Sequence, residues 1–84
     1  MKVTKIDIRK NENKEEKVRA YVTLEFDRAF VIKNIKIIDG NERIFVAMPS
    51  IKGTDGKYYD TAFPITKEFR SYIEEEVLKE YNKW

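Results

Sequence analysis

Residues 17–26 constrain the fold more than any other part of the chain. Their sequence, KVRAYVTLEF, is the clearest alternation between apolar and polar positions in the protein. Successive side chains of a β-strand point to opposite faces of a sheet, so this pattern is typical of a strand with one buried face. We expect the core-facing side to carry Val18, Ala20, Val22, Leu24 and Phe26, and the outward side to carry Arg19, Tyr21, Thr23 and Glu25.

Neighbouring segments predict further strands. Residues 2–10 alternate in the same way, with Thr4, Ile6 and Ile8 expected on the core side. β-branched and aromatic side chains, which favour strands, are frequent in residues 30–38, 43–48 and 58–63. Strands that follow one another with short connections indicate an antiparallel meander.

The connections carry turn signals. A polar, charged stretch at 11–16 is typical of a hairpin tip, and Asp-Gly lies at the centre of the turn at 39–42. A second Gly-containing turn is predicted at 53–57.

The end of the chain has the period of a helix. Pro64 ends the predicted sheet, and Thr66 stands where a helix N-cap belongs. Apolar side chains then recur every four residues, and we place a core-facing stripe on a helix of about 17 residues. The stripe consists of Phe69, Ile73, Val77 and Tyr81, widened by Leu78 and Trp84. The predicted fold is one α+β domain over residues 1–84, an antiparallel β-sheet of four to five strands followed by one C-terminal α-helix packed on the sheet.

Composition excludes several classes of function. The 84 residues contain no Cys and no His, which rules out a disulfide framework, a Cys-ligated zinc site, a thiol nucleophile and a Ser-His-Asp triad. No apolar run approaches the ~18 residues of a membrane span, and no signal peptide opens the chain. We therefore expect a cytoplasmic protein without membrane association.

The acidic residues and the one candidate nucleophile indicate no catalytic site. The three glutamates at 74–76 fan around the helix axis and cannot converge on one point. Asp39 and Asp55 both precede Gly, which is ordinary turn chemistry. Ser50 lies near Lys52, but nothing around it suggests an oxyanion hole. We expect no enzyme activity, no cofactor, no metal and no small-molecule substrate.

The basic side chains allow two interpretations. The chain carries 17 Lys and Arg against 15 Asp and Glu, a net charge of +2, so nucleic-acid binding would need a local patch. Sheets that bind nucleic acid present cations to phosphates and aromatic rings to bases. The same residues also solvate an ordinary exposed face and protect sheet edges, and the residues alone favour this second interpretation. The outward positions in question are Lys5, Arg9, Arg19 and Tyr21, together with Lys33, Lys36, Arg43, Lys52 and Lys57.

A family resemblance changes this balance. FVIKNIKIIDGNERIFVAMPS (30–50), followed by DG (55–56), PI (64–65) and VLKEY (77–81), resembles the SpoVG family of bacterial septation and sporulation regulators. The resemblance covers essentially the whole chain, and FVAMPS after IDGN is its most specific part. It implies a homodimer that binds DNA, and often RNA, in gene regulation linked to septation and sporulation.

The resemblance also implies which residues bind. Carried over by position, nucleic-acid contacts fall on Lys36, Lys52, Arg70 and Lys83, and the nearby loops add Arg43 and Lys57. Three positions depart from the family's pattern. Ile51 and Tyr59 stand where basic residues are common, and Phe63 stands where a histidine is common, so the loop charge is reduced.

Pro49 indicates where a homodimer would form. Proline cannot donate to a strand ladder, so it ends a strand or places it at an edge, and the residue before it is steered to extended geometry. An extended arm that leaves an edge strand can pair with its copy across a two-fold axis. We predict the dimer interface at Phe45, Val46, Ala47, Met48 and Pro49, with phosphate contacts in the following loop.

A second class of function stays open. The protein would then be an interaction module that modulates septum formation without direct nucleic-acid recognition. Its contacts would lie along a sheet edge or on the surface around Tyr58 and Tyr59.

Overall fold

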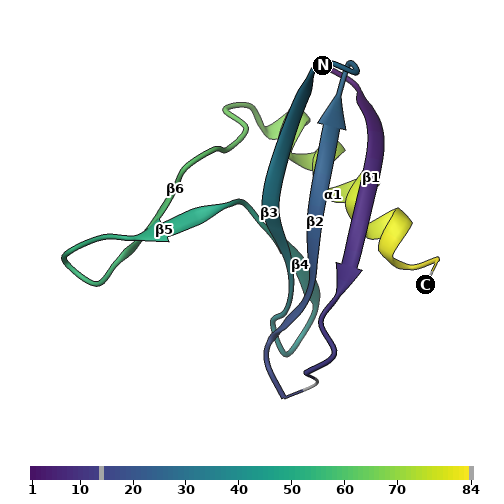
Figure 1. Cartoon of the computed structure of the whole chain (residues 1–84). Helices are drawn as coiled ribbons and strands as arrows, with labels where there is room; N and C mark the ends of the chain where they lie inside the picture. Colours follow the sequence, from purple (N-terminus) through teal and green to yellow (C-terminus); the bar gives the residue numbers. More distant parts are fainter. Residues whose placement is uncertain (14, 84) are drawn as a thin grey trace.

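The computed structural model describes residues 1–13 and 15–83, which form a sheet, a projecting hairpin and a helix (Figure 1). The strands are β1 (Val3–Lys10), β2 (Val18–Phe26), β3 (Phe30–Asp39), β4 (Ile44–Ala47), β5 (Ser50–Lys52) and β6 (Tyr58–Asp60). The helix α1 (Lys67–Tyr81) follows them. The predicted α+β architecture is therefore confirmed. Trp84, which we predicted as part of the helical stripe, lies outside the described residues.

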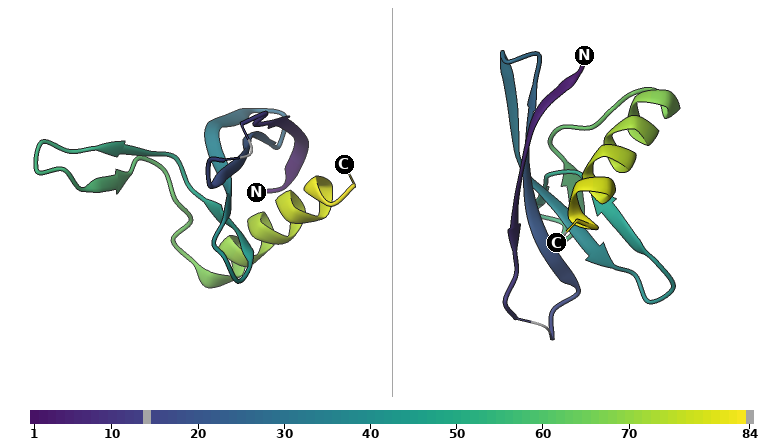
Figure 2. Two further views of the ribbon diagram at one scale, coloured as in Figure 1. Left: turned by 90° about the horizontal axis from the view of Figure 1, so that it is seen from below. Right: turned by 90° about the vertical axis from the view of Figure 1, so that its right-hand side faces the viewer.

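The first four strands form an antiparallel meander in chain order, with β1 and β4 at the two edges. β5 and β6 form a separate two-stranded sheet, which projects sideways from the end of β4 (Figures 1 and 2). The fifth strand that we expected over 58–63 is thus shorter, and it pairs with part of the segment expected to be a loop. Pro49 lies between β4 and β5, as its missing N–H leads one to expect.

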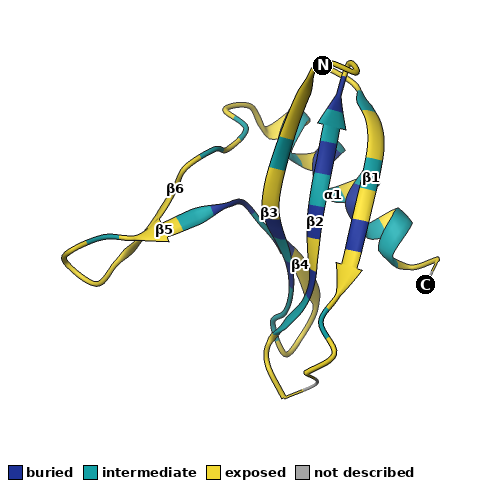
Figure 3. Ribbon diagram, viewed as in Figure 1, coloured by how far each residue is buried: buried dark blue, intermediate teal, exposed yellow. Residues whose placement is uncertain are grey.

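The core lies between one face of the sheet and α1 (Figure 2). Alternate residues of β2 are buried, which Figure 3 shows as an alternation of dark blue and lighter segments along the strand. This confirms the alternation predicted for residues 17–26, except that Val18 is only half-buried. The largest fully buried side chains are Val22, Leu24 and Phe26 of β2, Ile35 and Ile37 of β3, and Ile73 and Val77 of α1.

A bulge at the start of β1 corrects one prediction. The register shifts between Val3 and Lys5, so Thr4 is an extra residue in the strand. Val3 packs against the core instead, and Thr4 is exposed. The Thr4 hydroxyl donates to a carboxylate oxygen of Glu25 at 2.9 Å. Thr4 does not face the core, because the bulge inverts the alternation at this point.

A second bulge lies in the middle of β3. Val22 and Leu24 of β2 pair with Ile35 and Ile32, so β3 contains one residue more than β2 in this interval. Asn34 takes up the difference with a φ of 68°, in the left-handed region that Asn tolerates better than most residues. Ile32 and Ile35 consequently both face the core although they are three residues apart.

The helix begins where the sequence predicts and ends at Tyr81, so its 15 residues are slightly fewer than the roughly 17 expected. The Thr66 hydroxyl accepts a hydrogen bond from the N–H of Phe69 at 3.2 Å, which satisfies one of the free donors of the first turn. The predicted stripe packs on the sheet, with Ile73 and Val77 buried and its outer members half-buried. Among residues 1–13 and 15–83, no helix is both long enough and apolar enough to cross a membrane.

Candidate nucleic-acid interface

Residues 50–60, which we call the arm, form the most prominent projection of the molecule (Figure 1). Lys52 pairs with Tyr58 across its two strands. Two glycines shape its tip. Gly56 has a φ of 85°, which favours glycine, and a Cβ at Gly53 would lie 2.8 Å from the ring of Tyr59. The GTDG motif therefore builds a tight end that a side chain at either glycine would disturb.

A hydrogen-bond cluster fixes the tip of the arm. The hydroxyl of Tyr59 donates to the carboxylate of Asp55, and the N–H of Lys57 donates to Asp55 Oδ1 at 3.0 Å. These two bonds hold the pKa of Asp55 below its ordinary value of 3.8, and the bond from the Tyr59 hydroxyl has the larger effect. The same bond raises the pKa of Tyr59, because it favours the protonated hydroxyl. Tyr59, which stands where the family commonly has a basic residue, here has a structural role.

The arm presents cations and rings to solvent together. Lys52 and Lys57 are both exposed, and so are Ile51 and Tyr58, at 62% and 69%. Lysine side chains neutralise phosphates, and an exposed tyrosine ring can stack on a base. A two-stranded ribbon is also one of the elements that the major groove of DNA admits. The arm thus combines the shape and the side chains that a nucleic-acid contact needs.

The other basic residues that we predicted do not gather at the arm. Lys36 is half-buried in β3, and Arg43 is exposed in the turn between β3 and β4. Arg70 lies half-buried in the first turns of α1. Lys83 follows the helix and forms an ion pair with Glu80 at 3.4 Å. The C-terminal end of α1 lies on the opposite side of the molecule from the arm (Figures 1 and 2). The structure brings together Lys52 and Lys57, and spreads the remaining four residues over the surface.

The segment predicted as a dimer interface is partly core. Val46 and Met48 are 6% and 5% exposed, and Pro49 is also buried, so their side chains pack within their own chain. Phe45 is 37% exposed, and β4 is an edge strand of the sheet. What this segment offers to a second copy is therefore the backbone edge of β4 and the ring of Phe45.

Sequence reasoning missed two exposed apolar residues in the connection that follows the arm. Phe63 and Ile65 lie in the connection between β6 and α1 and are 57% and 90% exposed. An exposed apolar patch often marks an interaction site. The signal was available in the sequence, because a Pro-Ile pair just before a helix cap places the apolar side chain outside both the strand and the helix.

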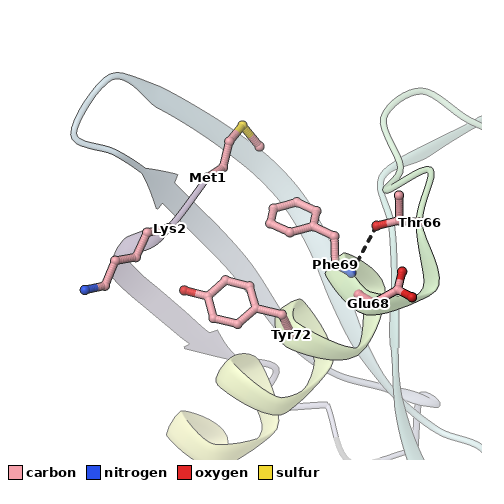
Figure 4. A pocket seen from close by; sticks show the side chains of 6 residues that line it. All are labelled: Met1, Lys2, Thr66, Glu68, Phe69 and Tyr72. Atoms are coloured by element: carbon pink, nitrogen blue, oxygen red, sulfur yellow. Dashed lines mark hydrogen bonds between the residues drawn. The ribbon is translucent and has the colours of Figure 1, made fainter.

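A hollow of about 460 Å³ lies at the start of α1, and two of the side chains that line it have structural roles (Figure 4). The hydroxyl of Tyr72, which lines it, accepts a hydrogen bond from the N–H of Val3 at 2.9 Å and ties the helix to β1. Thr66, also in its wall, caps the helix. Within the described ranges 1–13 and 15–83, no three Asp, Glu, His or Cys side chains cluster closely enough to hold a metal ion.

The fold and the arm define a class of small α+β proteins in which a charged, aromatic hairpin projects from a four-stranded sheet backed by one helix. A family model described as SpoVG matches residues 1–83. The chain belongs to the SpoVG family, and the resemblance noted from its sequence is confirmed.

Similar proteins carry the name septation protein SpoVG. One from Thermoanaerobacter sp. (strain X514) is 41% identical over 83 residues, which cover 99% of this chain and 89% of that protein. One from Oceanobacillus iheyensis is 45% identical, with 99% and 85% covered. A protein named SpoVG 2, from Listeria monocytogenes serotype 4b, is 42% identical, with 99% and 80% covered.

Proposed function

We propose that this chain is a homodimeric nucleic-acid-binding regulator, acting on DNA and also on RNA, in gene regulation linked to septation and sporulation. The link to septation comes from the names of its relatives. The observation that supports nucleic-acid binding best is the arm, which holds the exposed Lys52 and Lys57 beside an exposed Tyr58 on one projecting ribbon. In this proposal phosphate contacts from the arm set the affinity, and a few base contacts set the sequence preference.

Dimerisation would make the modest charge effective. One chain has a net charge of +2, which gives little general attraction to a polyanion. A two-fold pair joined along the edge of β4 duplicates the arm, so that two ribbons, each with two lysines, reach the same duplex. The exposed ring of Phe45 and the edge position of β4 support this arrangement.

The test is a binding titration of the purified protein against a short DNA duplex and a single-stranded RNA, each at two salt concentrations. We expect binding to both that weakens steeply as salt rises, because phosphate contacts release counterions. No binding at low salt would overturn the proposal.

A protein-interaction module that modulates septum formation is the second candidate. Exposed apolar side chains favour it, namely Ile51 in the arm and Phe63 and Ile65 in the connection that follows the arm. Salt separates the two functions, because an apolar protein contact responds little to ionic strength whereas phosphate contacts respond strongly.

A further inference from the structure

The face of the sheet opposite α1 is open (Figure 2). One row of side chains crosses three strands on this face. Arg9 of β1 pairs with Tyr21 of β2, and Tyr21 pairs in turn with Lys36 of β3. Cross-strand partners on one face have Cβ atoms about 5 Å apart, so Tyr21 has a basic residue on the neighbouring strand at either side. The ring is 37% exposed, which leaves part of it free for contact.

A groove adjoins this row. It has a volume of about 500 Å³, and its wall includes Asp7, Arg9, Tyr21, Thr23, Lys33 and Asn34. That volume lies within the range of small-ligand sites, roughly 300–1,000 Å³, and suits a nucleotide better than a double helix. The bulge at Asn34 interrupts β3 here and places Lys33 at the rim.

The charges on the face favour an anionic chain. Four cationic side chains, Lys5, Arg9, Lys33 and Lys36, stand there against Asp7 and Glu25. Glu25 is the cross-strand partner of Lys5, and Arg19 and Asp39 pair with each other at 3.0 Å, so of the charges named Arg9, Lys33 and Lys36 stand against Asp7 alone. Asp7 pairs with Thr23 beside the row and lines the same groove as Arg9 and Lys33, and a carboxylate there can accept from the amino group of a base.

We propose that this open face is a platform for single-stranded nucleic acid, on which Tyr21 stacks a base while Arg9, Lys33 and Lys36 contact the flanking phosphates. A single strand is the occupant because only unpaired bases can lie flat on a ring, and because Asp7, Thr23 and Asn34 offer hydrogen bonds to base edges that a duplex keeps paired. The row across three strands spans about 10 Å, which matches one or two nucleotides.

The platform is separate from the arm, which projects from the end of β4 (Figure 1). Lys36, expected from the resemblance to bind nucleic acid, belongs by its position to the platform. The inference rests on the proposed function only in that the ligand is again a nucleic acid. It goes further by assigning single strands to a surface different from the one that contacts duplexes.

The test compares the variants Tyr21→Ala, Tyr21→Phe and Lys52→Ala/Lys57→Ala by fluorescence anisotropy, using a labelled ten-nucleotide oligouridine and a labelled DNA duplex. Tyr21→Ala should weaken oligouridine binding roughly 10-fold or more, because a stacked base is lost. Tyr21→Phe keeps the ring and should stay within about twofold of the parent, since stacking needs only the π-face. Duplex binding should be unchanged in both Tyr21 variants and weakened in the double lysine variant. Thermal melts confirm folding, which an outward-facing side chain should leave intact.

A second readout reports stacking directly. On addition of oligouridine, the ring protons of Tyr21 should shift upfield in NMR spectra, and those of Tyr58 should shift less. Oligouridine binding that is unchanged in Tyr21→Ala would overturn the platform, and so would duplex binding without any single-strand binding. In either case the DNA-binding part of the proposed function stands as long as the lysine variant loses duplex affinity, and a complete absence of single-strand binding removes RNA from that function. Absence of binding to both nucleic acids would overturn the proposed function as well.

Discussion

Removing both lysines of the arm should flatten the salt dependence of duplex binding. Each phosphate neutralised by a lysine contributes about 0.9 to the slope of log K against log salt. Lys52→Ala/Lys57→Ala deletes two cations per chain and four per homodimer, so the slope should fall by about 3.6. Between 50 and 200 mM salt the parent would then lose about 150-fold more affinity than the variant does.

The variant should keep the fold of the arm. Both lysine side chains are exposed, and Lys57 holds the tip through its backbone, whose N–H donates to Asp55 and whose carbonyl oxygen accepts from Gly53 at 2.7 Å. Alanine leaves these bonds in place. A loss of affinity therefore reports the missing charges and not a collapsed hairpin.

The assay is a duplex titration at four or more salt concentrations between 50 and 300 mM. Lys2→Ala/Lys79→Ala is the matched control, because it removes the same charge from two exposed positions outside the arm. A general charge effect would change both double variants alike, whereas direct contacts would change the slope only for the arm. Parallel lines for the parent and the arm variant would refute the reasoning. A fall in the slope of about 1.8 would show that only one of the two arms contacts the duplex.

Three further predictions concern the arm, the helix and the dimer. The pKa of Asp55 is lower in the folded arm than its ordinary value of 3.8. The bonds to its carboxylate therefore stabilise the tip fully at pH values above 3.8, and this stabilisation is lost as the pH falls through the lower pKa of the folded arm. In an NMR titration the amide shift of Lys57 should turn at a midpoint below 3.8, and Tyr59→Phe should raise that midpoint. Thr66→Ala should lower the free energy of unfolding by about 1 kcal/mol in denaturant melts, with Thr66→Ser restoring most of it. Phe45→Glu should convert a dimer to monomers in sedimentation at micromolar concentration, and an unchanged dimer would exclude the edge of β4 as the interface.

Periodicity located the elements whose burial is regular. β2 and α1 each bury one face against the same core, so their patterns of two and of four residues are visible in the sequence. The bulge at Thr4 could not be found in that way, because a register shift depends on how β1 pairs with β2. β5 escaped because its three residues bury little and give no alternation to detect, with Ile51 62% exposed.

The candidate site was predictable only where its residues are neighbours in the chain. Lys52 and Lys57 share one hairpin, so the sequence could show that they lie near each other, whereas their role in binding stays a prediction. Lys83 could be placed only once the direction of α1 across the sheet was known. The dimer segment shows a further limit. An apolar residue such as Val46 or Met48 looks the same in sequence whether its own helix or a second copy covers it.

The free energy of ordering the arm connects the proposed dimer contact with the proposed nucleic-acid contact. A two-stranded hairpin is at best marginally stable alone, and each strand of the arm has only three residues. Its order depends on the turn at Gly56, on the bond between Tyr59 and Asp55, and on whatever covers its exposed side chains. A partner or a nucleic acid that binds the ordered arm more tightly must also shift the arm toward that ordered state. If dimerisation and duplex binding both favour the same ordered arm, dimerisation strengthens duplex binding and duplex binding strengthens dimerisation. This coupling needs no direct contact between the second copy and the duplex.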